Sequence, residues 1–342
     1  MNDKRMRTKY GIPAKMLQGL TLLLLIFGSC GEIEPIEVTY AEPEQTPYLS
    51  IMGAGLRESS AASGIVTRAD AAAPEEIILE DVADAIGVFL QADPDKGYKE
   101  AIFNKKYTYG TPVWMSDPHL MLEEISAQLA AYYPYDADCG NPKQVLLTSA
   151  RYEAGKEFYY LPFKASRMSS SLHLQLRRAY SLVRFNLFAG EEDTDAGKGA
   201  YKGDGEVTAF GVTAPLISTG MLNLYTGTVS PLNTGIALSV NETFTAGTQA
   251  APYALDFLIV PTDLSALADD ASKVSFTLTV DGKQMQGSLS AATFFGADKK
   301  LLEGVKYEAN VVIRPTGLEV ATLQVKDWEV VTGDADQPLE NI

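Results

Sequence analysis

Among the side chains of this sequence that could take part in covalent chemistry, the thiol of Cys30 stands in the clearest context. It directly follows Phe27-Gly28-Ser29, so that two small residues precede it. Upstream, Met16 to Phe27 is mostly apolar, and the first fifteen residues carry five cations against one anion. A cationic start, an apolar stretch of roughly 7–15 residues and small residues before the cut are typical of an export signal. The stretch is shorter than the ~20 apolar residues that a membrane-spanning helix needs.

This leader, together with Cys30, resembles the lipobox of bacterial lipoproteins, in which the thiol is acylated and the cysteine becomes the first residue. An ordinary export signal with an incidental cysteine is the alternative interpretation. We predict a lipoprotein signal peptide over residues 1–29, lipidation of Cys30, and a mature protein tethered to a membrane outside the cytoplasm. Removal of residues 1–29 takes away five cations and one anion, so the formal net charge moves from −16 to −20. This charge excludes general nucleic-acid binding, which needs a basic face.

Arg68 is a second residue with a chemical context, because trypsin-like proteases cut after arginine. It lies in a stretch of mostly small residues, from Ser59 to Ala73, which has little capacity to pack and should be exposed and cleavable. Before this stretch come an acidic, proline-bearing segment, 31–47, and a short apolar run, Tyr48–Met52. We interpret 31–47 as a tether, because such a segment cannot bury enough surface to fold alone. A solvated loop arginine is the plain alternative, and Arg57 is the second candidate for the cut.

Beyond residue 76 the apolar residues alternate with polar ones, which predicts β strands. An acidic, glycine-bearing segment without large aliphatic residues, 191–205, is the expected domain boundary. The predicted fold is mostly β, with few short helices and two tandem, transthyretin-like β-sandwich domains at 69–190 and 206–342. Asp281-Gly282 predicts a two-residue hairpin turn. Leu120–Ala131 fits either a helix face or a strand.

Several segments, in this order along the chain, resemble the fimbrillin family, the subunits of type V pili. Thr67-Arg68-Ala69, followed by Asp84–Phe89 with its Ile-Gly-Val-Phe run, is similar to the family's arginine segment and the strand after it. Ala130–Tyr135 resembles its Tyr-Tyr-Pro-Tyr strand end. Leu301–Trp328 resembles its C-terminal pattern of leucine, glycine, tyrosine and a late tryptophan.

The resemblance implies an assembly route. Subunits are exported to the outer membrane as lipoproteins. A trypsin-like or arginine-specific protease then removes the tether with the first strand, here residues 30–68, by cutting at Arg68. The open groove accepts a C-terminal strand from the neighbouring subunit, which is β-augmentation of an exposed sheet edge. Such a contact joins two different surfaces, so its repetition gives an open filament.

The expected partners are therefore neighbouring pilus subunits, in a homo- or heteropolymer, and the outer membrane through lipid before maturation. A host or bacterial surface ligand is a further expected partner. We expect no cofactor and no metal ion.

The C-terminus departs from the pattern of a good donor strand. After Trp328 only Val330 and Val331 continue the apolar pattern, and Thr332–Ile342 contains a glycine, a proline and three acids. Glycine and proline are unfavourable inside strands. The donor could include Leu323–Val331 instead, or the chain could be a tip or accessory subunit that donates nothing.

A search for catalytic or metal-binding groups gives weak candidates. His119 and His173 stand far apart without a second ligand nearby, and the acidic runs beginning at Asp93 and Asp193 lack the glycine and glutamate of a calcium loop. Cys139 has acidic neighbours, which do not activate a thiol. We therefore expect no enzyme. The main competing hypothesis is a surface lipoprotein that binds glycan or host protein and never polymerises; a secreted hydrolase is a remote third.

Overall fold

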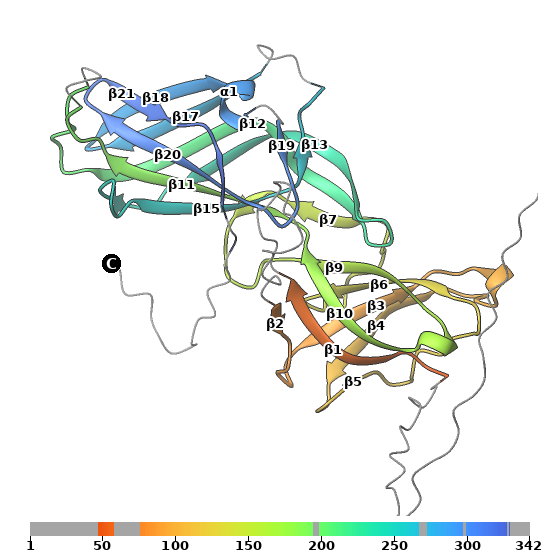
Figure 1. Ribbon diagram of the computed structural model, residues 1–342. Coiled ribbons are helices and arrows are strands. Elements are labelled where there is room, and N and C mark those ends of the chain that lie inside the picture. Colours follow the sequence, from red (N-terminus) through yellow and green to blue (C-terminus); the bar gives the residue numbers. More distant parts are fainter. Residues whose placement is uncertain are drawn as a thin grey trace, which may run out of the picture. The chain divides into compact units, whose positions relative to one another are not determined.

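The computed structural model describes residues 47–57, 76–193, 198–266, 272–296, 299–326 and 328, and β strands account for most of them (Figure 1). Short helical turns occur at η1 (Pro94–Lys96), η2 (Arg167–Ser169) and α1 (Ala291–Phe295). Within the described ranges no helix is both long and apolar enough to cross a bilayer. The prediction of a mostly β fold is confirmed.

The first part of the chain forms an eight-stranded sheet in the order β10-β9-β6-β3-β4-β5-β1-β2. Because β1 also pairs with β10, the sheet closes on itself, and β2 lies outside the ring beside β1. A closed sheet leaves few unpaired edges. The strands are β1 (Ser50–Arg57), β2 (Glu76–Ile78), β3 (Ala85–Leu90), β4 (Ile102–Tyr109), β5 (Trp114–Met115), β6 (Ala127–Tyr133), β9 (Tyr159–Ala165) and β10 (Ser171–Arg178).

Two further sheets come mostly from the second part of the chain. One has the order β21-β20-β11-β15-β8, with β22 also on β20; the other has the order β13-β12-β17-β18, with β14 and β7 also on β12. β16 (Thr262–Asp263) and β19 (Lys300–Leu301) form a small separate pair. The remaining strands are β7 (Val145–Thr148), β8 (Ala150–Arg151), β11 (Ser181–Ala189), β12 (Glu206–Asn223), β13 (Thr228–Val240), β14 (Phe244–Thr245), β15 (Tyr253–Ile259), β17 (Lys273–Val280), β18 (Lys283–Ser290), β20 (Lys306–Arg314), β21 (Gly317–Val320) and β22 (Gln324–Lys326).

These two sheets share one apolar core, in which aromatic rings from both sheets meet. Phe185 is at its centre: its ring centroid lies 5.6–5.8 Å from those of Phe210, Phe257 and Phe276, and 6.4 Å from that of Phe294. Such tilted and edge-on ring pairs stabilise a core beyond the area they bury. The predicted hairpin at Asp281-Gly282 joins β17 to β18, and the positive φ angles of both residues suit that turn.

Strand pairing does not follow the boundary expected at 191–205. β11 precedes that segment but pairs with β15 and β20, which follow it. β7 and β8 also come early in the chain, and they pair with β12 and β15. The range 69–190 therefore contributes three strands to the sheets formed by later residues.

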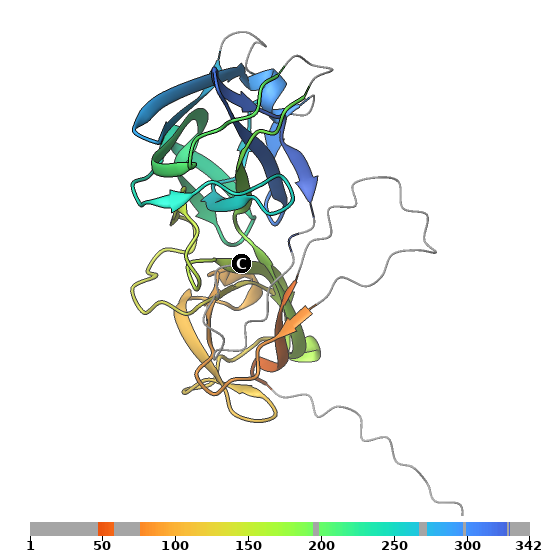
Figure 2. The same ribbon diagram turned by 90° about the vertical axis from the view of Figure 1, so that its left-hand side faces the viewer.

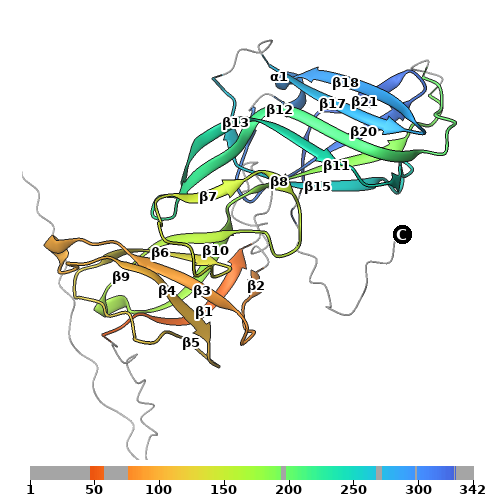
Figure 3. The same cartoon turned by 180° about the vertical axis from the view of Figure 1, so that it is seen from behind.

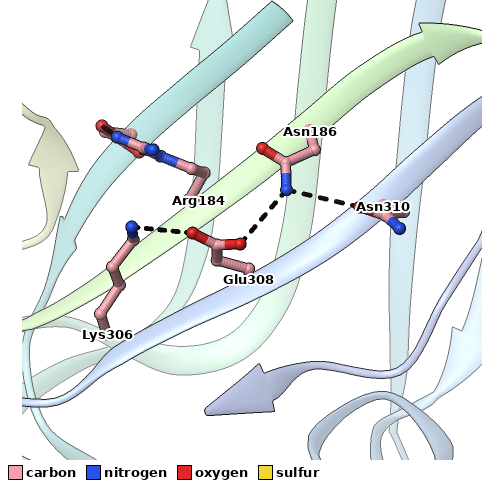
Figure 4. A network of polar contacts seen from close by, with 6 residues as sticks. Arg184, Asn186, Lys306, Glu308 and Asn310 are labelled. Carbon is pink, nitrogen blue, oxygen red and sulfur yellow. Dashed lines mark hydrogen bonds and ion pairs between the residues drawn. The ribbon is translucent and has the colours of Figure 1, made fainter. Parts of the chain in front are cut away.

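A polar network on β11, β15 and β20 shows why β11 keeps this register (Figure 4). Nε and Nη2 of Arg184 both donate to the carboxylate of Asp256 at 2.7 Å. Glu308 forms an ion pair with Nζ of Lys306 at 2.7 Å, and its carboxylate accepts a hydrogen bond from the side-chain amide of Asn186 at 3.5 Å. Cross-strand pairs of opposite charge favour one register over its neighbours.

A glycine opposite a tyrosine connects two of the segments that we singled out in the sequence. Gly87 of β3 is the register partner of Tyr132 of β6. A Cβ on Gly87 would lie 2.0 Å from Cε1 of Tyr132, so the tyrosine ring lies over the glycine. That ring is fully buried and lies near-parallel to the rings of Phe89 and Phe158, at centroid distances of 5.7 and 5.5 Å. The glycine is therefore needed for space.

We predict that Gly87→Ala destabilises the protein by about 2 kcal/mol or more, because the new methyl group must displace a buried ring. Gly140→Ala is the matched control, since the nearest atom to its added Cβ lies 3.8 Å away. Urea unfolding of both variants measures the difference. Equal stability of the two variants would contradict the packing that we describe.

The end of the 191–205 segment is held by the hairpin turn. Asp281 accepts hydrogen bonds from the hydroxyl of Tyr201 at 2.6 Å and from the backbone N–H groups of Gly205 and Glu206 at 3.1 and 2.9 Å. The Tyr201 hydrogen bond is the main cause that lowers the pKa of Asp281, and the backbone N–H groups add to it. The ionised carboxylate of Asp281 therefore holds the start of β12 in place.

Asp281→Asn should lower the melting temperature at pH 7 by roughly 2–4 °C, since it removes charge-assisted hydrogen bonds. The folded-state pKa lies below the ordinary value of about 4, so the stabilisation is present above that pH and is lost as the pH falls through the folded-state pKa. Melting curves of wild type and variant should approach each other as the pH falls below about 4 and coincide below the folded-state pKa. A constant difference from pH 7 to pH 3, or an equal effect of the exposed control Glu124→Gln, would contradict this role.

Candidate functional site

The candidate site is the place that β1 occupies in the first sheet (Figures 2 and 3). On one edge β1 pairs in parallel with β10, from Ser50 opposite Ser171 to Arg57 opposite Arg177. On its other edge it pairs antiparallel with β5 near its start and with β2 near its end. β1 is therefore an interior strand, and its removal would leave a groove between β10 and the strands opposite.

The side chains of this segment fill the core of the first sheet. Leu49, Ile51, Ala54 and Leu56 are only 2%, 0%, 4% and 6% exposed and belong to one buried cluster, whereas Met52 is 42% exposed. The pairing with β10 shifts register between Ile51 and Gly53. This bulge moves the inward positions by one residue, so the inward side chains are spaced by two, three and two. We call the places that these four side chains fill the sockets.

Backbone hydrogen bonds extend the attachment beyond the first residue of β1. The N–H of Leu49 donates to the carbonyl of Leu120, and the N–H of Leu122 donates to the carbonyl of Pro47, each at 2.8 Å. The hydroxyl of Tyr107 donates to the carbonyl of Leu49 at 3.4 Å. Burial raises the pKa of Tyr107 to about 12, so the hydroxyl keeps its proton at neutral pH.

Both histidines of the chain lie against residues 48–57, which we call the first-strand segment. The ring of His119 stacks on Tyr48, with 4.3 Å between centroids. His173, on β10, is the register partner of Gly53, and its Nδ1 lies 2.7 Å from where a Cβ on that glycine would be. The sequence prediction treated neither histidine as a ligand or a base and found no link to the segment. No sequence signal could have shown it, because only the long-range pairing brings these residues together.

Of the residues predicted to be lipidated or cleaved, only Arg57 is among the described residues. Cys30 and Arg68 lie outside the described residues. Arg57, the second candidate for cleavage, is the exposed last residue of β1, and its backbone lies between partners Arg177 and Glu76 on the two neighbouring strands. Of the predicted first strand, Tyr48–Met52, residues 50–52 belong to β1, which continues to Arg57, and Tyr48 forms an isolated bridge with Met121.

The other candidates from the sequence remain structural. Asp93 forms a 2.6 Å ion pair with Lys96 inside a short helical turn, and the described ranges contain no group of three or more His, Cys, Asp or Glu residues suited to a metal ion. Cys139 is half-buried, and burial raises the pKa of its thiol. A raised pKa makes a thiol a poorer nucleophile at neutral pH.

Comparison with known proteins gives one family and a set of similar folds. A sequence model of the fimbrillin-like family matches residues 67–328. The crystal structure of a candidate cell adhesion protein from Bacteroides uniformis ATCC 8492 is 15% identical, with a TM-score of 0.51, over 82% of this chain and 98% of that chain. One from Bacteroides ovatus ATCC 8483 is 16% identical, also with a TM-score of 0.51, over 83% and 98%. At this identity the likeness shows a shared fold. No curated protein matches the chain.

Ile51→Ala should cost about 2–5 kcal/mol in unfolding free energy, because it empties a fully buried socket in the first sheet. Met52→Ala, one residue along the same strand, should cost less than about 1 kcal/mol, since that side chain is 42% exposed. Chemical denaturation of the full chain measures both. If Met52→Ala lowered the unfolding free energy as much as Ile51→Ala, the account of β1 with Ile51 facing the core and Met52 facing outward would be wrong.

Proposed function

The chain belongs to the fimbrillin-like family, and from that premise we propose that it is a structural subunit or an accessory, tip-located adhesin of a surface fimbria. It is exported as a lipoprotein attached through Cys30, matured by cleavage at Arg68, and joined to its neighbours by donor-strand exchange. This places it at the outer membrane before maturation and in the fimbria afterwards. The role requires binding surfaces and no catalysis.

The observation that carries this proposal is the position of β1. It is the first strand described, yet it is interior to the sheet, and together with the preceding Leu49 it places four apolar side chains in the core. A covalently attached strand has an effective concentration of the order of millimolar for a short linker, and cleavage removes this advantage. After a cut downstream of β1, only non-covalent contacts retain it: the ladder, the four sockets and the hydrogen bonds just before the strand. A competing strand can then replace it.

The strand pairing also favours Arg68 over Arg57 as the cut. A protease needs to bind several residues around the scissile bond in an extended and unpaired form, and Arg57 is paired on both edges. Cleavage at Arg68 would also release β1 as a whole, while β2 stays with the body of the chain. The lipid on Cys30 would leave with the released segment, which frees the subunit from the membrane.

Replacement of β1 by a strand from another molecule joins two different surfaces. The acceptor contributes β10, β5 and β2, and the donor contributes a strand from elsewhere in its chain. A contact of this kind does not close into a dimer and repeats along a filament. The donor's backbone would satisfy the N–H and C=O groups that β1 leaves unpaired on both neighbouring strands.

We predict that a low dose of trypsin cuts the purified precursor first after Arg68, and that Arg68→Gln blocks this cut. Arg57→Gln is the matched control and should leave it unchanged, because Arg57 is held in the sheet. Mass spectrometry of the fragments locates the cut, and electron microscopy of the concentrated, cut protein shows whether filaments form, alone or with a donor subunit.

Digestion of the core before any cut near Arg68 would contradict the maturation step. A cut protein that keeps β1 in the presence of every donor strand tested would favour the competing hypothesis of a non-polymerising surface lipoprotein.

A further inference from the structure

The four sockets differ in size, and this difference restricts which strand can replace β1. Counting Leu49 as position one, the inward side chains stand at positions one, three, six and eight. Leucine, isoleucine and leucine fill positions one, three and eight, whereas position six holds Ala54. Ala54 is 4% exposed, and its register partner Leu174 is 2% exposed in the same cluster. A larger side chain at position six would therefore have to displace packed core residues.

Position five is restricted as well, from the other face of the strand. Gly53 occupies this position, and a Cβ atom on Gly53 would lie only 2.7 Å from Nδ1 of His173. The exposed imidazole can turn away, so this restriction is weaker than the one at position six. The groove therefore calls for large side chains at positions one, three and eight and a small one at position six. A small residue at position five is also favoured.

Other segments of the chain have the same spacing, among them Leu318–Val325 with Leu323 at position six, and the one nearest the C-terminus is 323–330. Leu323, Val325, Trp328 and Val330 stand at positions one, three, six and eight, and the four residues between them are polar or charged. Its position six is a tryptophan, and its position five is Asp327. The spacing fits the groove, but both small positions are filled by larger side chains.

This segment also has a place of its own in the fold. β22 pairs with β20, from Lys306 opposite Lys326 to Glu308 opposite Gln324. Trp328 is only 5% exposed, and the guanidinium of Arg178 lies 4.2 Å from its ring centroid. β22 is therefore part of a sheet of its own molecule, and Trp328 is part of its core.

We propose that the groove left by β1 selects its donor by size at position six, accepting alanine or smaller and rejecting residues 323–330 of another copy of this chain. The donor is then a strand of a different protein, with large apolar side chains at positions one, three and eight. This inference rests on the proposed function, since it concerns the partner of the same groove.

Strand exchange with peptides tests this selection in the full chain cut at Arg68. A labelled peptide of residues 48–57 should displace the cut first strand, as followed by native mass spectrometry. The same peptide with Ala54→Trp should exchange about tenfold less or worse, because overpacking of this kind costs more than one tenfold step in binding. Met52→Trp is the matched control, with the same added bulk on the outward face, and should exchange like the parent.

A second peptide pair tests the rejection of the chain's own segment. The peptide of residues 322–331 should fail to exchange, and the same peptide with Asp327→Gly and Trp328→Ala should gain exchange. Equal exchange by the Ala54→Trp and Met52→Trp peptides would overturn the size selection. So would exchange of unmodified 322–331 at the level of 48–57.

Two further outcomes separate this inference from the proposed function. If the 48–57 peptide itself fails to enter protein that is cut at Arg68, donor-strand exchange fails, and the inference with it. In the uncut chain, Ala54→Trp should lower the melting temperature clearly more than Met52→Trp. Equal melting temperatures would overturn the size limit of the socket independently of any exchange.

Discussion

The structure depends on the parallel pairing of β1 with β10. Within the described residues, this contact closes the first sheet and covers its core with the four side chains of the first-strand segment. A parallel pair joins segments that are far apart in the chain, and its ladder is slightly weaker per residue than an antiparallel one. The strand that closes the sheet is therefore held by a slightly weaker ladder and by side-chain packing, and a strand of another molecule with matching side chains could supply both.

Under the proposed function, these contacts would let one sequence support both a stable precursor and an exchangeable strand. Ile51 and its three inward neighbours are buried as deeply as the centre of any ordinary core, so the uncut chain gains full benefit from them. Their attachment to the body passes through the segment that contains Arg68. A single cut changes no contact, yet it makes the occupancy of the groove depend on concentration and competition.

Much of the fold could be predicted from the sequence, because alternation of apolar residues indicates which faces of a strand are buried. The mostly β class, the hairpin at Asp281-Gly282 and the existence of a strand near Tyr48 all follow from such local patterns. Alternation does not indicate which strand is the partner. This is why β11 was assigned to residues 69–190, although its charged and amide side chains match Asp256 and Glu308 in later strands. It is also why no pattern placed His119 and His173 beside the first strand.

The limits at the candidate site have the same physical origin. The register shift after Ile51 moves the inward positions by one residue, and a bulge has no distinctive composition in this segment. Gly53 and Ala54 look like ordinary small residues in the sequence, and their meaning comes from His173 and Leu174 on β10. Gly87 is similar, since only the structure shows the ring of Tyr132 above it. At such positions a small residue is required because a neighbouring side chain fills the space beside it. The sequence does not show which side chain that neighbour is.

Hydrogen exchange at the backbone of β10 is the most direct measurement of the central claim, that β1 alone closes the first sheet and can leave it. In the uncut protein the amides of Ser171–Arg178 should be protected like those of the interior strand β6. After cleavage at Arg68 and release of the first strand, protection should fall along β10 and β2 while β6 keeps its own. Unchanged protection of β10 after release, or loss of protection throughout the sheet, would contradict the account.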